Sequence, residues 1–504
     1  MTTPTELYAC VYAKEFPTQA LLRLRPELLH QPCVVMEGDP PLQSVCSLNV
    51  KAKATGATHG MTPVEIETLP SVRVLSRSRN EENAAKAALL ELAGSSSPRV
   101  EDHSSNNAFV SVIDIAGTER LLGSPHELGK ALFARIRTLG ITACIAVSTN
   151  AHASICLAKG LSLLAPVMVL PLGQESAVLA ALPLGILDLS EEQAETFASW
   201  GIHTLGMLAE LPEKELIARM GQEGKRLRQL SRGVLPHLFQ AVKPAFLLEE
   251  QIELDSPVEL LDSLLFVIAV MLEQLILRVT ARILALASIT ITLSLEGGGS
   301  HARTVRPALP SNDRQLWIKL LHLDLEAHPP DASILALKLN AEPGSTSKMQ
   351  LGLFSPQLPE PACLDVTLAR IAKIVGEENV GQAVLLDTHQ QEAFRMERFT
   401  VPTSKPITAP SGHTPAAMRA LRPAEDVTVT VREGRPERIV FRRQRYSVER
   451  VYGPWLAHGD WWNSSLWEVD QWDLVTRAED GQLLCCCLVC DLLQDRWQMA
   501  GLYD

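Results

Sequence analysis

The chain has 504 residues, of which 46% are hydrophobic, so it can bury several cores and does not have the composition of a disordered protein. Its formal net charge of −12 excludes a protein that coats nucleic acid with its whole surface, so any contact with a polyanion must come from a local basic face. The ten cysteines are irregularly spaced and do not suggest a disulfide framework, and we expect a multidomain cytoplasmic protein with no signal peptide and no membrane contact.

The N-terminal third alternates predicted strands and helices, which is typical of an α/β layer with helices packed on a sheet. Within it, the polar stretch 95–107 is predicted to be an exposed loop. The predicted elements are, in chain order, strand 7–12, helix 18–29, strand 32–36, a small unit at 45–75, strand 108–115, helix 124–139, strand 143–148 and a helix that begins near Asn150.

Residues 181–234 are predicted to be helical, and the segment 200–206 is predicted to lie between two of these helices. The tetrapeptide 256–259, Ser-Pro-Val-Glu, has the form of a capping box with proline at the first helical position, which predicts a long helix from 257 to about 285. A strand at 289–295, a helix at 314–328 and a strand at 333–339 are predicted to follow.

The C-terminal part of the chain begins with a change in composition. Five prolines lie among small and polar residues between 400 and 423, which predicts a linker. The remainder is predicted to be a small β-rich module, and it holds six of the eight tryptophans.

Three local signatures resemble those of the Y-family translesion DNA polymerases, the UmuC and DinB group. They are a fingers motif at 50–57 with Gly60 and Met61, a palm stretch at 113–117 with 121–123, and a thumb hairpin at 201–208. The resemblance implies an α/β multidomain fold with the right-hand architecture of that family. The implied domains are palm and fingers at 1–165 (fingers about 37–76), a helix-hairpin-helix thumb at 166–236, an α/β little finger at 237–345, a clamp-binding peptide with a helical extension at 346–399, a Pro-rich linker at 400–425 and a Trp-rich module at 426–504.

Nucleotidyl transfer needs two divalent metal ions, and ions such as Mg²⁺ require clustered carboxylates. The resemblance places one metal-binding aspartate at Tyr12 or Lys14, depending on the register, and an adjacent Asp-Glu pair at Phe109 and Val110. Glu15 is the only acid within reach of the first position. We therefore predict no catalytic residues and no metal ligands, and Mg²⁺ becomes a cofactor only if the protein is an active polymerase.

The positions that contact the triphosphate in the family are also changed. The fingers arginine is Lys53, the palm Asn-Lys pair is Asn150 followed by Ala151, and the steric-gate aromatic is Pro17. Lys53 and Asn150 are predicted to be the remnant of a nucleotide-binding site.

The segment Gln350, Leu351, Gly352, Leu353 and Phe354 resembles the peptide with which bacterial polymerases bind the sliding clamp. Such a peptide supplies apolar anchors and one amide from an extended segment, and the neighbouring residues are loop-like. The alternative is an apolar patch packed under a loop.

The thumb hairpin is predicted to bind DNA without sequence preference, through backbone N–H groups and a basic flank. The residues involved are Gly201, Ile202, Thr204, Gly206, Arg219, Lys225 and Arg226. The alternative is a purely packed helix pair. The arginines between 432 and 450 form either a second nucleic-acid surface or a solvated strand face.

Two features of the C-terminal module have competing interpretations. Cys485, Cys486, Cys487 and Cys490 suggest zinc, but no second pair of ligands lies nearby, so a buried strand is favoured. The tryptophans form either a base-stacking platform or a protein-docking surface, and docking is favoured.

These patterns predict a non-catalytic scaffold for error-prone translesion synthesis. The resemblance implies as partners primer–template DNA, the sliding clamp, a DnaE-type C-family polymerase and a RecA-like protein. The alternatives are an active low-fidelity Y-family DNA polymerase, which would use acids such as Glu15, Glu101, Asp102 or Asp114, and a protein hub without DNA contact.

Overall fold

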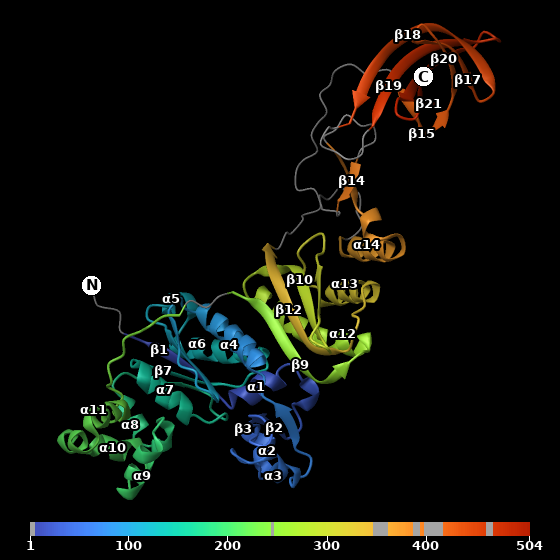
Figure 1. Cartoon of the computed structure of the whole chain (residues 1–504). Coiled ribbons are helices and arrows are strands. Elements are labelled where there is room, and N and C mark those ends of the chain that lie inside the picture. Colours follow the sequence, from blue (N-terminus) through green and yellow to red (C-terminus); the bar gives the residue numbers. More distant parts are fainter. Residues whose placement is uncertain are drawn as a thin grey trace. The chain divides into compact units, whose positions relative to one another are not determined.

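The computed structural model describes residues 6–242, 246–345, 361–386, 394–397, 417–459 and 467–503. The chain forms two compact units, Met1–Arg370 and Ile371–Asp504, and each is described by itself (Figure 1). The first unit contains three sheets and a helical region, and the second contains a large antiparallel sheet.

The first sheet has five strands in the order β5-β6-β1-β7-β8. Its central strand β1 pairs antiparallel with both β6 and β7, while β8 is parallel to β7. The first four residues of β1 are buried, since both faces of the sheet are covered. The strands are β1 (Tyr8–Lys14), β5 (Val100–Asp102), β6 (Ala108–Asp114), β7 (Cys144–Ser148) and β8 (Val167–Val169).

Two layers cover this sheet (Figure 1). Helices α1 (Phe16–Leu22), α4 (Arg79–Gly94) and α6 (Pro125–Thr138) contribute to the core on one face. Helix α7 (Ala151–Gly160) and the helical region contribute to the core on the other. The short α5 (Glu119–Leu122) precedes α6. Helix α6 begins with the capping box of Ser124 and Glu127, close to the predicted start.

Two predictions for this part of the chain are wrong. The helix expected over 18–29 ends at Leu22, and only the 3₁₀ turn η1 (Pro26–Leu28) follows, because Pro26 lacks the N–H that would continue an α-helix. The exposed loop expected over 95–107 contains strand β5, whose Val100 and Glu101 are buried beside β6. The polar sequence of this stretch predicts a loop, but its pairing with β6 stabilises a strand there.

The second sheet is small, in the order β3-β2-β4, and it carries two short helices. Its elements are β2 (Cys33–Glu37), β3 (Ser44–Leu48), β4 (Arg73–Ser76), α2 (Val50–Ala54) and α3 (Pro63–Glu67). Asn49 caps α2 and Thr62 caps α3, so two turns of the chain are fixed by side-chain hydrogen bonds.

The helical region follows β8 and contains α8 (Glu175–Leu179), η2 (Leu184–Ile186), α9 (Glu191–Ser199), α10 (Leu205–Glu210) and α11 (Glu213–Ser231). Thr204 caps α10 through the Met207 amide, and Gly221, at φ 65°, kinks α11. Helices α9 and α10 flank the segment 200–204, so the connection expected over 200–206 is shorter, because α10 already begins at Leu205.

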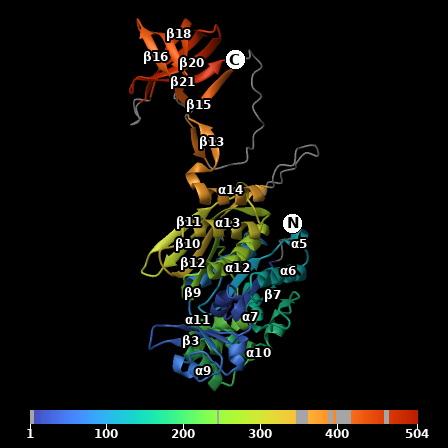
Figure 2. The same cartoon turned by 90° about the vertical axis from the view of Figure 1, so that its right-hand side faces the viewer.

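The third sheet has the order β11-β10-β12-β9 and is packed against two helices (Figure 2). Its elements are β9 (Leu248–Val258), α12 (Leu261–Thr280), β10 (Leu284–Leu295), β11 (Ser300–Val305), α13 (Arg314–Ala327) and β12 (Ile334–Ser345). The helix expected over 257–285 is therefore shorter at both ends. Strand β9 continues through Pro257 to Val258, which pairs with Ile334, so sheet pairing overrides the capping-box pattern.

Helix α12 is the one described helix that is long and apolar enough to cross a membrane by length and composition. Half of its most apolar window is buried, and Ile268, Met271 and Leu275 are fully buried in the core of the third sheet. We interpret α12 as the core helix of this sheet.

Buried ion pairs join the third sheet to the first layer of helices. Arg278 of α12, the helix packed on that sheet, pairs with Glu91 of α4 at 2.7 Å. Arg23 pairs with Glu250, and the side chains of both residues are fully buried. Loss of one partner from such a pair leaves an uncompensated buried charge, so these contacts are strongly coupled to folding.

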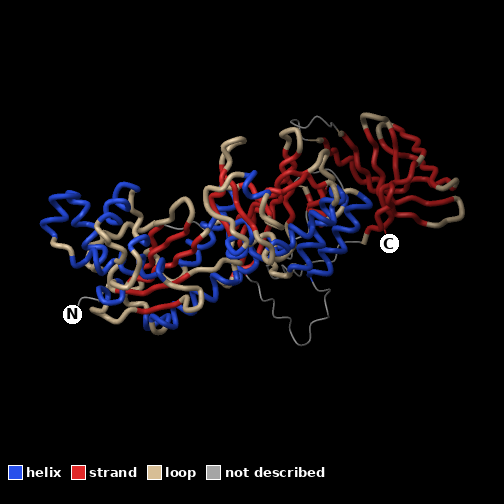
Figure 3. Tube along the Cα trace, turned by 90° about the horizontal axis from the view of Figure 1, so that it is seen from below, coloured by secondary structure: helices blue, strands red, loops and turns tan. Residues whose placement is uncertain are grey.

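The second unit is dominated by a seven-stranded antiparallel sheet, ordered β15-β21-β20-β19-β18-β17-β16 (Figure 3). Its strands are β15 (Met418–Asp426), β16 (Thr428–Arg432), β17 (Arg435–Phe441), β18 (Gln444–His458), β19 (Glu468–Ala478), β20 (Leu483–Asp491) and β21 (Arg496–Tyr503). The linker expected up to 425 therefore includes most of β15, which pairs with β21. Before this sheet the chain forms α14 (Pro361–Val375), η3 (Glu377–Asn379), β13 (Gln382–Leu385) and β14 (Phe394–Glu397).

Candidate functional site

The positions where carboxylates were expected lie beside one another in the first sheet. In the β1–β6 ladder Tyr12 is directly opposite Val110, and Lys14 is opposite Ala108. Tyr12 and Val110 also belong to the same core, on the sheet face covered by α7 and the helical region. A phenol and an isopropyl group therefore occupy neighbouring places on one face, and neither supplies the anionic oxygens that Mg²⁺ requires.

Phe109 lies on the opposite face of the same sheet. Its side chain is fully buried and packs against Phe16, with ring centroids 5.7 Å apart. It belongs to the core formed with α4 and α6. The position of Phe109 is thus a packing position in this protein.

Tyr12 stays neutral at physiological pH. Burial raises the pKa of its phenol, and the Glu15 carboxylate raises it further. A neutral phenol cannot replace an aspartate as a ligand for a hard cation. Tyr12 borders a cavity of about 300 Å³, which is also lined by Lys14, Glu15, Val45, Cys46, His59, Asn107 and Ala108.

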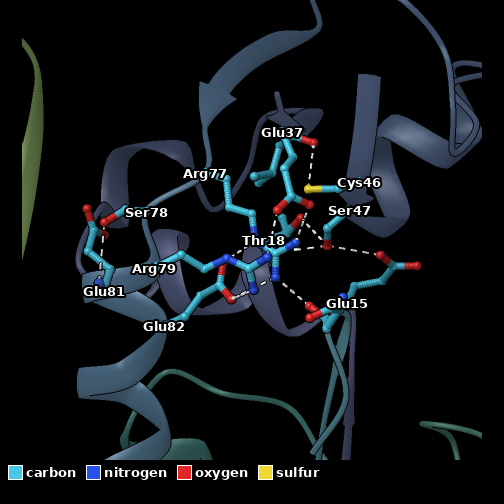
Figure 4. A network of polar contacts seen from close by, with 12 residues as sticks. Glu15, Thr18, Glu37, Cys46, Ser47, Arg77, Ser78, Arg79, Glu81 and Glu82 are labelled. Carbon is cyan, nitrogen blue, oxygen red and sulfur yellow. Dashed lines mark hydrogen bonds and ion pairs between the residues drawn. The ribbon is translucent and has the colours of Figure 1, made fainter. Parts of the chain in front are cut away.

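Glu15 is the acid nearest to this cavity, and both of its carboxylate oxygens have partners (Figure 4). One oxygen lies 3.0 Å from His59 Nε2. The other accepts hydrogen bonds from Ser47 Oγ at 2.9 Å and from the Leu48 amide at 3.2 Å. Glu15 has a φ of 53°, so it leaves the alternation of β1 and turns toward the second sheet. Its contacts join two sheets.

Figure 4 shows a second polar junction next to Glu15. The Arg77 guanidinium donates to Glu82 at 2.7 and 2.8 Å and to Glu37 at 2.7 Å. Arg79 also donates to Glu37, at 2.6 Å. Burial acts to lower the pKa of Arg77, but the two carboxylates outweigh it and raise that pKa. The junction fixes the second sheet to α4, and the carboxylates of Glu37 and Glu82 are both paired with arginine.

Asp102 and Asp114, which the polymerase alternative would use, also have partners elsewhere. Asp114 Oδ2 lies 2.7 Å from Arg99, and its other oxygen accepts from the Ala116 amide at 3.0 Å. Asp114 is opposite Tyr8, at the other end of the ladder from Tyr12. Asp102 lies 2.5 Å from Lys86 Nζ.

Glu101 belongs to a different cluster, which brings together β5, α7 and the segment after α11. Its Oε2 lies 3.0 Å from His103 Nε2 and 2.5 Å from His237 Nε2. The His237 ring also approaches His152, with Nδ1 and Nε2 3.3 Å apart. Burial acts to raise the pKa of Glu101, but the Gln240 amide and the two imidazoles hold it below its ordinary value. Burial, with His237 nearby, lowers the pKa of His152 to about 4.

The sequence did not indicate this cluster, and we predicted no metal ligands. His237 is 136 positions from Glu101, and His152 comes from a third element. The only local signal is Glu101-Asp102-His103, which places Glu101 and His103 on one face if the segment is a strand. That segment was predicted to be a loop.

The two residues predicted to be the remnant of a nucleotide-binding site, Lys53 and Asn150, have different surroundings in the structure. Lys53 is exposed on α2. Asn150 caps α7 by accepting from the Ala153 amide, and its amide nitrogen donates to the Leu235 carbonyl at 2.8 Å. Asn150 thus has structural partners on both sides of its amide group.

The thumb hairpin uses most of its backbone N–H groups internally. The amides of Gly201, Ile202, Leu205, Gly206 and Met207 donate to Ala198, Phe197, Leu182, Ala180 and Thr204, respectively. Ile202 is buried, and a Cβ at Gly206 would lie 2.9 Å from the Ala180 carbonyl oxygen. The expectation that the whole segment offers amides to phosphate is therefore wrong, because helix packing consumes them. Within the described residues, the amides of His203 and Thr204 have no recorded acceptor.

The basic flank of the hairpin is partly neutralised. Arg226 pairs with Glu223 at 2.6 Å, and Lys225 lies 3.6 Å from Glu213. Arg219 lies over the Trp200 ring, 6.0 Å from its centroid. Lys225 and Arg226 are each about half exposed at the side chain, so they remain accessible to a phosphate.

The predicted clamp-binding segment, Gln350 to Phe354, lies outside the described residues.

In the second unit, β20 carries Cys485, Cys486, Cys487 and Cys490, which confirms the predicted strand. Burial raises the pKa values of Cys486 and Cys487 to about 12, so both are neutral thiols. Trp472 is a core residue, while Trp455 is half exposed beside Tyr452 and Leu456.

The arginines between 432 and 450 that the structure describes are exposed on or beside strands β16 to β18. Arg432 pairs with Glu437 at 3.3 Å and Arg442 with Glu425 at 2.5 Å. A solvated strand face accounts for these contacts.

Comparison with known proteins places this geometry in context. Residues 11–159 match the impB/mucB/samB family. Protein ImuB of Caulobacter vibrioides (strain NA1000) is 23% identical over 393 residues, which cover 76% of this chain and 83% of ImuB. DNA polymerase IV of Moorella thermoacetica is 30% identical over 169 residues, which cover 31% of this chain and 40% of the polymerase.

Among solved structures, DinB from Sulfolobus solfataricus is similar with a TM-score of 0.41 and 15% identity, covering 67% of this chain and 98% of DinB. An insertion ternary complex of Dbh DNA polymerase gives the same TM-score, with 16% identity and the same coverage. In sequence, residues 11–159 are therefore similar to the impB/mucB/samB family, most of the chain is similar to ImuB, and shorter stretches are similar to DNA polymerase IV.

Proposed function

We propose that this protein is a non-catalytic, polymerase-like scaffold for DNA-damage tolerance. In this proposal it holds primer–template DNA without sequence preference, binds the sliding clamp and recruits a DnaE-type polymerase and the RecA-like protein ImuA during error-prone translesion synthesis. It acts in the cytoplasm. Recruitment needs no chemistry, because tethering raises the local concentration of the active polymerase at a stalled primer end.

The observation that carries this proposal is the pairing of Tyr12 with Val110 in the first sheet, with Phe109 buried behind it. The resemblance to the Y family puts metal-binding carboxylates at these positions. Three of the acids that the polymerase alternative would use are bound to other groups: Glu15 to the second sheet, Asp102 to Lys86 and Asp114 to Arg99. Freeing any of them would break a contact that joins elements of the fold.

DNA binding is supported by the thumb hairpin, although by fewer groups than the sequence suggested. In this proposal the amides of His203 and Thr204 and the side chains of Lys225 and Arg226 donate to DNA phosphates. Their number predicts weak binding with a shallow salt dependence.

Partner recruitment is supported by two regions. The segment Gln350 to Phe354 has the composition of a clamp-binding peptide. In the second unit, the exposed side chains of Tyr452, Trp455 and Leu456 follow one another closely on β18, and aromatic residues of this kind are enriched at protein interfaces.

Primer extension tests the central point. The full chain is incubated with primer–template, all four dNTPs and Mg²⁺ or Mn²⁺, and we expect no incorporation above a buffer control. The alternative, a low-fidelity polymerase, has one structural argument in its favour: Glu15 lines the 300 Å³ cavity beside Tyr12. Incorporation that is lost on Glu15→Gln or Asp114→Ala would establish the alternative.

Clamp binding is tested by replacing Gln350, Leu353 and Phe354 with alanine and measuring capture of the full chain on immobilised clamp. We expect capture to be lost while the far-UV circular dichroism spectrum stays unchanged. Capture that persists would place the clamp-binding segment elsewhere. A chain that binds the clamp but shows no salt-dependent retention on primer–template would be a hub without DNA contact.

A further inference from the structure

The cluster of Glu101, His103 and His237 has the composition of a transition-metal site. Each residue offers one ligand atom, and the three atoms all lie within 4.8 Å of one another. Glu101 comes from β5, His103 from the turn that follows β5, and His237 from the segment after α11. Two imidazoles and one carboxylate form the ligand set of many zinc sites that keep a fourth position open.

We propose that Glu101, His103 and His237 bind a divalent transition-metal ion, of which zinc fits best. The ligand atoms are Glu101 Oε2, His103 Nε2 and His237 Nε2. This goes beyond the proposed scaffold function, because it adds a metal to a domain whose expected magnesium site has lost its carboxylates.

The spacing of the ligand atoms supports the proposal. Around a tetrahedral zinc ion, ligand atoms at about 2.0–2.2 Å from the metal lie about 3.3–3.5 Å from one another. Glu101 Oε2 already lies 3.0 Å from His103 Nε2 and 2.5 Å from His237 Nε2. Small rotations about side-chain bonds are enough to admit the ion.

A second layer of contacts orients the ligands before any metal arrives. The Gln240 amide donates to Glu101 Oε1, which leaves Oε2 directed at the two imidazoles. Glu101 is only 3% exposed, so its carboxylate cannot turn away into solvent. When a metal occupies His237 Nε2, the proton resides on Nδ1, and Nδ1 donates to His152 Nε2, 3.3 Å away. Partners of this kind are the usual supports of histidine ligands.

The environment also provides room for a fourth ligand. A cavity of about 240 Å³ borders the cluster, and its walls include His103, His152, Lys159 and Arg226. A water molecule can enter there, and the two cationic side chains of the wall are paired with the carboxylates of Asp188 and Glu223. Nitrogen ligands select zinc and related ions over magnesium, so this site is no substitute for a polymerase metal centre.

A metal at this position would fasten the segment after α11 to the first sheet. Val242 of this segment already donates its amide to the Val100 carbonyl at 2.8 Å, so the segment runs beside β5. The metal would add coordinate bonds at His237, between this backbone contact and the end of α11. We therefore expect metal removal to loosen residues 234–242 selectively.

The test uses the full chain, stripped with a chelator and dialysed against zinc. We expect about one tightly held zinc ion per chain by elemental analysis, and at least a tenfold loss of affinity in His237→Gln and in Glu101→Gln. His126→Gln, on the exposed surface of α6, is the matched control and should keep the wild-type affinity. Cobalt substitution of the wild-type chain should give the intense visible absorption of a tetrahedral site, and the spectrum should be lost in His237→Gln.

The cobalt spectrum keeps the proposal testable even if a variant folds poorly, since it is recorded on the unaltered chain. Wild-type protein that retains no zinc, or that gives only the weak spectrum of octahedral cobalt, would overturn the proposal. So would a folded His237→Gln variant that binds zinc as tightly as the wild type.

Discussion

The Tyr12–Val110 pair and the cluster around Glu101 lie close together on the first sheet but differ in the metal ligands they offer. At the Tyr12–Val110 pair, where the resemblance to the Y family implies carboxylates, the chain has a phenol and an aliphatic side chain. One strand away, Glu101 meets two imidazoles, and the His103 amide donates to the Val110 carbonyl at 2.8 Å. The same sheet thus carries the Tyr12–Val110 pair, which offers no ligand for Mg²⁺, beside the cluster of Glu101, His103 and His237, which offers ligands for zinc. Which metal ion a part of this sheet can bind is therefore decided by a few side chains, and the backbone of the sheet is the same in both cases.

The largest expected effect tests whether the first place is now a packing position. Phe109→Ala should lower the free energy of unfolding by about 3–5 kcal/mol, because it removes a fully buried ring and leaves a cavity against Phe16. Urea denaturation measures the change. The control is Phe266→Ala on α12, where the ring is 59% exposed and the loss should stay below about 1 kcal/mol. Equal losses in the two variants would contradict the interpretation of Phe109.

The second prediction is that the cluster around Glu101 binds zinc and that the Tyr12–Val110 pair binds no Mg²⁺. Zinc at 100 times its dissociation constant should raise the free energy of unfolding by about 2.7 kcal/mol, since it binds only the folded chain. Millimolar Mg²⁺ should leave the melting temperature unchanged. Differential scanning calorimetry checks both. A stabilisation by Mg²⁺ that survives Glu101→Gln would show that a hard-cation site exists elsewhere and would break the comparison.

A third prediction concerns the one acid that lines the cavity beside Tyr12. Glu15→Gln should cost about 1–2 kcal/mol of stability, because the hydrogen bonds and ion pair to the second sheet are weakened. Chemical denaturation again gives the value. Glu67→Gln, an exposed position on α3, serves as the control and should change stability by less than about 0.5 kcal/mol. If Glu15→Gln is neutral, the carboxylate is free for another role.

The smallest expected effect is on DNA binding by the thumb hairpin. Lys225→Ala should weaken binding to primer–template by a few fold and reduce the slope of log affinity against log salt by about 1, since one phosphate contact is removed. Fluorescence anisotropy at several salt concentrations measures both quantities. Lys130→Ala, on the exposed side of α6, should change neither. A slope that stays the same in Lys225→Ala would remove this residue from the interface.

Local signals predicted much of the fold. The Ser124 capping box locates the start of α6, and Asn150 caps α7 at the predicted position. Local signals failed where pairing or packing over long distances decides the outcome. Ser256 to Glu259 looks like a helix start, but Val258 is held in a strand by Ile334.

The candidate site shows the same limit. The expectation at Phe109 and Val110 rests on counting back from Asp114 in the palm stretch, and the expectation at Tyr12 or Lys14 depends on the register of the first strand. The cluster of Glu101, His103 and His237 could not be predicted, because its members meet only when the segment after α11 folds back onto β5. The segment 201–208 was expected to offer its amides to phosphate, but the amides of Gly201, Ile202 and Gly206 donate to carbonyl oxygens of neighbouring helices and turns, which local sequence does not reveal.

The central claim is that no catalytic metal pair can assemble beside Tyr12 and Val110. The most direct measurement is the anomalous diffraction of Mn²⁺ in crystals of the full chain with primer–template and an incoming dNTP. We predict that no manganese ion will lie in the cavity bordered by Tyr12, Lys14 and Glu15. Two ions there, about 3.5–4 Å apart and bridged by the triphosphate, would contradict it.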